Sequence, residues 1–283
     1  KLLLPALLVY AGLFATLHPD PLGVVRDYAA FLFLGVAGAI FANSTGAGGG
    51  VVFIPAFGQL GFSELQSVAT SFGIQCYGMT AGAITWTLYY RRNRRTVPAW
   101  QAFVPIIALC SVISVAGVWT VYALGLAPPA AVKPLFGGFS VFLGVAVLVT
   151  TLLYGAVGSH QLERNDLVLL ACIALGGGMI TAWLSVGVGE FVAIYLILRR
   201  FDVTLSVAAA VVISAITVWC AVPQHLFREP SIYWEVVLFA GPGAVLGGLI
   251  ARRLVLWLGT RRLKLFFGFW LLVIGTIELA IAR

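Results

Sequence analysis

Charged residues are scarce in this sequence. Asp, Glu, Lys and Arg make up only 10% of its 283 residues, against about 25% in soluble globular domains. Hydrophobic residues make up 61%, and the mean hydropathy is +1.04. This composition excludes an ordinary soluble domain and predicts an all-α polytopic membrane protein, with the lipid bilayer as its surroundings.

The motifs of common enzyme classes are also missing. The glycine-rich stretch at residues 46–50 lacks the Lys-Ser/Thr pair of a phosphate-binding loop, and no GxSxG or HExxH motif occurs. The four cysteines stand singly inside apolar spans, and the three histidines fall in three different loops. We therefore expect no enzyme, no cofactor and no metal, with a membrane enzyme or redox protein relying on Cys76 or Cys172 as an alternative.

Basic residues exceed acidic ones, giving a formal net charge of +7. They fall in short gaps between apolar spans, notably residues 91–95, which is typical of the positive-inside pattern and not of a nucleic-acid partner. The pattern predicts a multi-pass protein of the plasma membrane (bacterial inner membrane), with the N-terminus cytoplasmic and the C-terminus periplasmic. Whether it forms a homo-oligomer is left open.

Two of the apolar spans are too short to cross a bilayer, which takes about 20 helical residues. These spans are residues 51–60 and 189–199, and each follows a glycine break, at residues 43–50 and 185–190. Four of the five residues 46–50 are glycine, and each glycine costs a helix interior about 1 kcal/mol relative to alanine. Backbone without helical hydrogen bonds is tolerated at membrane depth only where it is buried in protein or lines a cavity, so each break marks a candidate site.

Each short span forms either a re-entrant hairpin or one discontinuous crossing with the span before it. The hairpin interpretation places 13 of the 17 basic residues on the cytoplasmic side, so it is preferred. It gives two inverted-topology repeats, each a re-entrant hairpin plus three transmembrane helices, after an extra N-terminal helix. The predicted units are residues 1–23 (N-terminal transmembrane helix), 24–154 (first repeat, hairpin tip 43–50), 155–165 (cytoplasmic linker) and 166–283 (second repeat, hairpin tip 185–190).

Weak internal similarity supports the duplication. At an offset of 141 residues, six of the eighteen positions 34–51 are identical to positions 175–192. Near the ends of the repeats, residues 133–139 resemble residues 264–270 at an offset of 131. Paired breaks in inverted repeats are the sequence sign of a secondary transporter's binding site.

The breaks predict an anion site. After each break, a short helix presents unpaired N–H groups and the positive end of its dipole, and glycine lets an anion approach the backbone. With no Lys or Arg expected at mid-depth, amides and hydroxyls would hold the anion. The candidate substrate-binding residues are Asn43, Ser44, Thr45, Gly46, Gly48, Gly49, Gly50, Thr70, Ser71, Gln75, Ser185, Gly187 and Gly189. The alternative for the hydroxyl and amide side chains is that they join membrane helices to one another.

Glu190 is the one acidic residue expected near the bilayer middle. A carboxyl group there is energetically expensive and is by default a functional hypothesis. Beside an anion site it favours the protonated form, so Glu190 is the candidate for coupling protons to anions. The alternative is a neutral buried side chain, or one bonded to the local backbone.

The same residues resemble a known family. Residues 46–50 with Pro55, residues 61–62 and residues 68–71 resemble the first-repeat signature of the sulfite exporter TauE/SafE family, and residues 241–253 and 261–268 resemble its C-terminal pattern. In the second repeat, Glu190-Phe191 replaces the Gly-Gly of the first. The resemblance implies a permease for sulfite or organosulfonates. The two inverted repeats predict that it works by alternating access around the hairpin tips. An anion channel with the glycine loops as its filter is the alternative.

Overall fold

A computed structural model describes residues 21–129, 131–153 and 161–281, and this part of the chain is helical with no strands. The expected all-α class is confirmed. The predicted helix within residues 1–23 lies almost wholly outside the described residues, and the predicted boundary after residue 23 falls inside α2. The helices are α2 (Pro21–Tyr28), α3 (Phe31–Thr45), α4 (Gly50–Gln59), α5 (Glu64–Tyr89), α6 (Phe103–Leu124), α7 (Val132–Leu153), α8 (Arg164–Leu184), α9 (Val188–Leu198), α10 (Val203–Pro223), α11 (Trp234–Leu258) and α12 (Thr260–Ile281).

Six helical segments of the described chain are long and apolar enough to cross a membrane, and a seventh exists if the bent pair α2 and α3 counts as one span. The six contain α6, α7, α8, α10, α11 and α12. Helix α5 was expected to cross but is not among them. Helix α5 is long enough, but its polar residues Ser67, Thr70, Ser71 and Gln75 make it less apolar than the six spans. All four side chains are buried inside the bundle.

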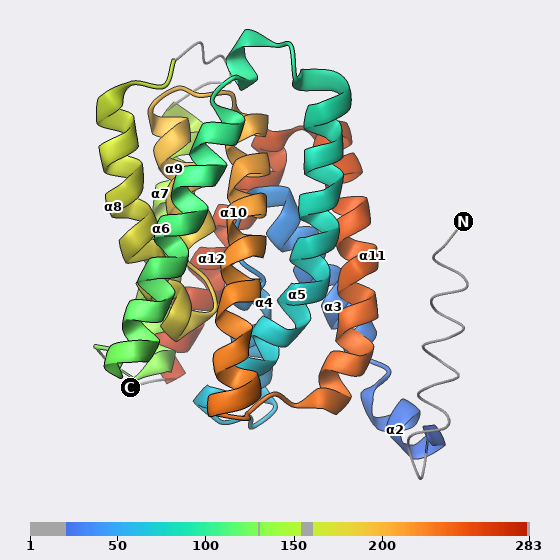
Figure 1. Cartoon of the computed structure of the whole chain (residues 1–283). Helices are drawn as coiled ribbons and strands as arrows, with labels where there is room; N and C mark the ends of the chain where they lie inside the picture. The colour runs from blue at the N-terminus through green and yellow to red at the C-terminus, as the bar shows by residue number, and fades with distance from the viewer. Residues whose placement is uncertain (1–20, 130, 154–160, 282–283) are drawn as a thin grey trace.

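Two helical hairpins enter the bundle from opposite ends (Figure 1). In hairpin 1, α3 and α4 both have their outer ends near the start of α11, where Tyr28 and Phe62 contact Tyr233. In hairpin 2, α8 and α9 have their outer ends at the opposite end, where Asp166 pairs with Arg199. The two hairpins therefore bring their tips together inside the bundle.

Most of the described basic residues gather at the end of the bundle where hairpin 2 enters, which we name the arginine-rich end. This end holds the loop after α5, the start of α8, the end of α9 and the junction of α11 with α12 (Figure 1). Of the described basic residues, only Arg26, Lys133 and Arg228 belong to segments at the other end.

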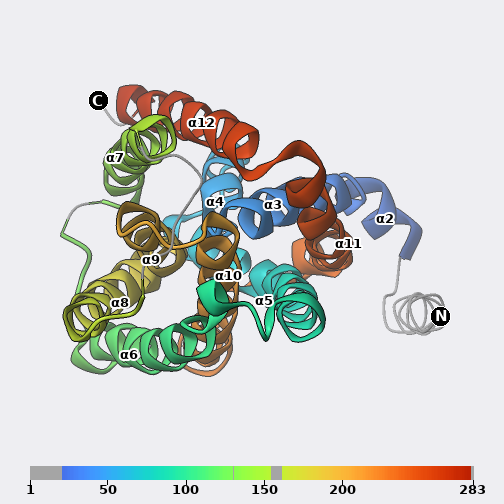
Figure 2. The same ribbon diagram turned by 90° about the horizontal axis from the view of Figure 1, so that it is seen from above.

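Glycines let three pairs of helices pack backbone against backbone. A Cβ on Gly243 would overlap the Leu32 carbonyl oxygen between α11 and α3, and one on Gly178 would overlap the Ser114 carbonyl oxygen between α8 and α6. Between α7 and α12, a Cβ on Gly144 would lie 2.9 Å from the Gly268 oxygen. Small residues at helix interfaces are the usual way for membrane helices to approach closely. Figure 2 shows the α6–α8 and α7–α12 pairs at the periphery, with α4, α9 and α10 between them.

Candidate functional site

The tips of the two hairpins are short non-helical segments inside the predicted ranges, 43–50 and 185–190. They are shorter than predicted, because residues 43–45 belong to α3, Gly50 to α4 and residues 188–190 to α9. Tip 1 (residues 46–49) begins where α3 ends, at Gly46 with φ of 85°. Tip 2 (residues 185–187) begins at Ser185 with φ of 56° and continues through Gly187 with φ of 149°. The positive φ at positions 46 and 187 suits glycine, because any Cβ there would be strained. Each tip thus reverses the chain within a few residues and starts a new helix, α4 or α9.

The Glu190 side chain joins the two tips. Its Oε1 accepts a hydrogen bond of 2.7 Å from the amide of Gly48 in tip 1, and its Oε2 accepts one of 2.9 Å from the amide of Gly187 in tip 2. Glu190 is only 4% exposed. The Glu190 carboxyl group therefore occupies two amide donors that the sequence led us to assign to a substrate anion. Gly48 lies in the opposite hairpin, and Gly187 lies in the same hairpin as Glu190.

Gln75 on α5 forms a second connection between the tips. Its Oε1 accepts a hydrogen bond of 2.8 Å from the Gly49 amide. Its Nε2 donates to the carbonyl oxygen of Ser185 at 3.0 Å and lies 2.7 Å from the Ser185 hydroxyl. Ser71, one helical turn earlier, receives hydrogen bonds from both Gln75 and Ser185 at 3.0 Å. The predicted residues Ser71, Gln75, Gly49 and Ser185 therefore meet in one buried cluster.

The backbones of the two hairpins approach too closely for larger residues. A Cβ on Gly189 would overlap the Gly46 carbonyl oxygen and the Ser214 hydroxyl, and one on Gly50 would lie 2.8 Å from the Ser185 carbonyl oxygen. Ser214 on α10 stands against Gly189 in the first turn of α9, whereas Gln75 on α5 stands against tip 1. Any opening between the tips has to separate these contacts.

Other predicted residues lie around this cluster and not in it. Thr70 accepts a hydrogen bond from the Tyr233 amide at the start of α11, away from the tips. Asn43 donates to the carbonyl oxygens of Ala39 and Gly78, so it joins α3 to α5. Thr45 accepts from the Ala47 amide and shapes tip 1, whereas the buried Ser44 hydroxyl has no partner among the described residues.

Cavities approach the tips from both ends of the bundle. One of about 300 Å³ opens between α3, α11 and α12, with Ser44 and Thr45 at its inner end and Arg262 at the arginine-rich end. Another of about 370 Å³ lies at the opposite end, lined among others by Glu64 and His225. The tip contact lies between them.

Two functional candidates were missed by sequence reasoning. Thr181 on α8 accepts a hydrogen bond from the Val188 amide and so caps α9. Lys264 was assigned to the cytoplasmic face, yet it is only 6% exposed and lines a cavity together with Glu190. No sequence signal identifies Lys264, because Lys133, its match at an offset of 131, is exposed.

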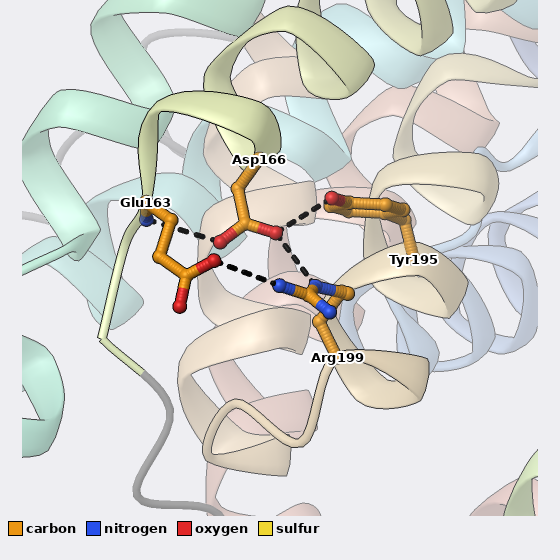
Figure 3. A network of polar contacts seen from close by, with 4 residues as sticks. All are labelled: Glu163, Asp166, Tyr195 and Arg199. Carbon is orange, nitrogen blue, oxygen red and sulfur yellow. Dashed lines mark hydrogen bonds and ion pairs between the residues drawn. The ribbon is translucent and has the colours of Figure 1, made fainter.

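The outer end of hairpin 2 is clamped by ionic and polar contacts (Figure 3). The buried Asp166 accepts hydrogen bonds of 2.7 Å from both the Tyr195 hydroxyl and the Arg199 Nε, and one of 3.0 Å from the Glu163 amide. Asp166 raises the pKa of Arg199 further above its usual range, so this guanidinium stays charged at any working pH. The clamp makes α8 and α9 one rigid hairpin.

Replacing Asp166 by Ala is expected to lower the melting temperature in detergent by several degrees. The change leaves the Glu163 amide and the Tyr195 hydroxyl without their acceptor and the Arg199 guanidinium without its closest anion. Thermal denaturation measures the effect. Glu163→Ala is the matched control and should change less, because it removes the 3.4 Å contact to Arg199 and the side-chain acceptor of the Asp166 amide but keeps the buried Asp166 carboxylate. Equal melting temperatures for wild type and Asp166→Ala would contradict the clamp.

The described residues hold no group of three or more His, Cys, Asp or Glu side chains placed to bind a metal ion. All four cysteines are free, with Cys76 and Cys110 buried, Cys172 exposed and Cys220 partly buried. The polar chemistry at the centre of the molecule is therefore that of amides, hydroxyls, one carboxyl group and one amine.

Comparison with known families gives one match. A family model described as "Sulfite exporter TauE/SafE" matches residues 30–277, which include both hairpins and all the helices from α3 to α11. No curated protein and no solved structure matches the chain. The resemblance noted in the sequence is thus confirmed over most of its length.

Proposed function

The chain belongs to the sulfite exporter TauE/SafE family, and on that premise we propose that it is a secondary transporter of small sulfur-containing anions, sulfite or organosulfonates, driven by protons. One observation carries the proposal. The Glu190 carboxyl group accepts hydrogen bonds from the amides of Gly48 and Gly187, so an acidic group of the protein itself already occupies donors in both tips. A substrate oxyanion would use the same amide donors.

Glu190 and the substrate anion compete for the same amide donors, and the protonation of Glu190 decides which of them is bound. While ionised, the Glu190 carboxylate keeps the amides of Gly48 and Gly187. A proton added to one of its oxygens removes the charge and weakens that oxygen as an acceptor, because hydrogen bonds to ionised groups are about twice as strong. The freed amides then bind the substrate oxyanion. Each anion bound would therefore accompany one proton, and loss of that proton would expel the anion.

Alternating access follows from two inverted repeats that rock against each other. The pattern of helix contacts supports this assignment. Exchanging α3–α7 with α8–α12 converts the α3–α11 contact into α8–α6, α5–α11 into α10–α6, and α4–α5 into α9–α10, and all of these contacts occur. The paired glycines of α7 and α12, at an offset of 131, fit the same symmetry. In this scheme the tip contact is the barrier, and each repeat carries one tip.

The proposed orientation places the arginine-rich end in the cytoplasm of a bacterial cell, as the positive-inside rule requires. Helix α12 runs away from that end, so the C-terminus would be periplasmic. The cavity at Ser44 and Thr45 would then face the cytoplasm, and the one at His225 the periplasm.

An anion channel fits this geometry less well than a transporter. A channel filter needs donors that remain open to a stream of ions. Here the amides of Gly48 and Gly187 are held by Glu190, and the amide of Gly49 by Gln75. Each passage must break these bonds, which is the behaviour of a carrier.

Gly189→Ala is expected to abolish uptake while the protein still inserts in the membrane. The added methyl overlaps the Gly46 carbonyl oxygen and the Ser214 hydroxyl, so the tips cannot close. Uptake of sulfite into proteoliposomes with an imposed proton gradient measures the effect. Gly176→Ala on α8 is the matched control, because a Cβ there meets nothing within 4 Å. Wild-type uptake by the Gly189→Ala variant would overturn the assignment of the tips.

The substrate class is tested by thermal shift of the purified protein against sulfite, sulfate, thiosulfate, sulfoacetate, taurine and carboxylate analogues. Ligands that bind the folded state raise the melting temperature in proportion to the logarithm of their concentration. We expect sulfite or a sulfonate to stabilise the protein and carboxylates to have little effect. Stabilisation by carboxylates alone would refute the sulfur-anion assignment.

A further inference from the structure

Lys264 is a buried amine with no ion pair to any acidic residue in the described part of the chain. It lies on the first turns of α12 and is only 6% exposed. Its ammonium group has no hydrogen bond or ion pair with any residue in the described ranges. A buried unpaired charge is expensive, so ionisable groups inside membrane spans usually face a partner or a hydrated cavity. Lys264 can therefore carry its charge only when an anion lies close to it.

A small cavity links Lys264 to the hairpin tips. Its volume is about 20 Å³, and it is lined by Glu190 and by the Thr45 and Thr150 side chains together with Lys264. A cavity of this size holds roughly one water molecule. Glu190 and Lys264 face the same space but lie more than 4 Å apart, since they form no ion pair. The larger cavity that reaches Arg262 shares Thr45 and Phe267 with it, so the two are adjacent.

Few ionisable groups face Glu190 from the elements packed around it. From α12 the only one is Lys264. Helix α5 contributes Gln75 and, in the same apolar cluster as tip 1, the Cys76 thiol. The described parts of α3, α7 and α10 contribute hydroxyls, from Thr45, Thr150 and Ser214. The Thr45 and Thr150 hydroxyls donate to carbonyl oxygens of their own helices, so each has to rotate away from that acceptor before it can donate to an anion. Lys264 is thus the one cation placed to balance Glu190.

We propose that Lys264, with the Thr45 and Thr150 hydroxyls, forms a second anion subsite between the tips and the arginine-rich end, where a small sulfur oxyanion rests on its way to or from the tips. In this position Lys264 serves in turn as counter-ion for ionised Glu190 and for the substrate. This inference rests on the proposed function, because it assumes that such an anion reaches the tips.

Because Glu190 and the substrate share Lys264 as their counter-ion, the net charge of the cavity can stay at zero. Without substrate, the cavity holds the Lys264 ammonium and the Glu190 carboxylate, with no net charge. A monoanion that enters adds one negative charge, and a proton taken up by Glu190 restores neutrality. The anion and the proton therefore travel together, and neither is stable in the low-dielectric interior without the other. The cavity must widen to admit the anion, and its neighbour of about 300 Å³ offers the room.

The test compares Lys264→Met with Lys133→Met. Lys133 is the matched control, because it occupies the corresponding position of the first repeat but is exposed at the opposite end. Sulfite binding to the purified protein is measured calorimetrically at two pH values. We expect Lys264→Met to weaken binding roughly tenfold or more, as loss of a charge-assisted contact does, and to flatten its pH dependence. Lys264→Arg should retain part of the affinity, and Lys133→Met all of it.

A second variant guards against misfolding of Lys264→Met. Thr150→Val keeps the shape of the side chain but removes one hydroxyl from the cavity, and we expect a several-fold loss of sulfite affinity. Thr151→Val, next to it but outside the lining, should bind as wild type. If the wild type binds sulfite and Thr150→Val and Lys264→Met both match its affinity and pH dependence, the subsite is refuted while the transporter stands. If the wild type binds no sulfur anion, the proposed function itself fails.

Discussion

Replacing Glu190 by Gln is expected to abolish the dependence of anion binding and uptake on pH. The glutamine is uncharged at every pH, so it cannot exchange a proton for a substrate anion. It also provides one acceptor oxygen for the two amides of Gly48 and Gly187, and its own NH₂ group meets the other amide as a second donor. Sulfite would then compete only with a weak neutral group for the tip amides.

Two measurements separate coupling from folding. Sulfite uptake into proteoliposomes with and without a pH gradient reports coupling, and we expect roughly tenfold stimulation by the gradient in wild type to fall to none in Glu190→Gln. Sulfite affinity measured across pH should vary for wild type and stay constant for the variant. Glu235→Gln, near the start of α11 and far from the tips, should behave as wild type. If the Glu190→Gln variant kept the wild-type response to pH, another residue would have to bind the coupling proton.

Both breaks could be predicted from the sequence because their causes are local. Glycine runs and positive φ values act within a few residues, and the length of each apolar span is visible directly. The helices after the breaks begin at Gly50 and Val188, each within one residue of the expected start. The sequence also predicted that each short span forms a hairpin with the span before it. Most basic residues fall on one side of the membrane only if each hairpin enters and leaves on the same side.

The partners of the tip amides could not be predicted in the same way. Glu190 meets Gly48 across 142 residues of chain, and nothing local to either position specifies the contact. The glycine run of tip 1 predicted a substrate anion, and the acceptor found there is the Glu190 carboxyl group of the opposite hairpin. The sequence offered a proton-coupling role for Glu190 without showing that its oxygens and a substrate would need the same donors.

Helix faces were only partly informative. Thr70, Ser71 and Gln75 recur at helical spacing, which indicated one functional face. Ser71 and Gln75 do reach tip 2, but the Thr70 hydroxyl turns to the start of α11 and accepts from the Tyr233 amide. Successive residues differ by about 100° around a helix, so neighbours in sequence meet different elements. Which element packs on each face depends on the whole bundle, as the burial of Lys264 also shows.

Gln75→Leu is the substitution expected to damage both stability and transport. Gln75 is 2% exposed, and its amide group is the acceptor for the Gly49 amide and a donor to the Ser185 carbonyl oxygen. Leucine fills similar space but leaves both backbone groups unpaired, at a cost of about 1–3 kcal/mol each. The melting temperature in detergent should fall by several degrees, and sulfite uptake should drop to background, because the two tips lose the side chain that fixes their relative position.

The control for Gln75 is Gln66→Leu on the same helix. Gln66 is half-buried and its side chain caps the start of α5 through Ser63, so its loss should leave sulfite uptake unchanged and cost about 1 kcal/mol or less. If Gln75→Leu were as stable and as active as Gln66→Leu, the Gly49 and Ser185 groups would have to find water, and the tips would be more open than their contacts imply. Loss of uptake with full stability would instead assign Gln75 to the substrate. The paired measurement therefore decides whether this glutamine holds the barrier or binds the anion.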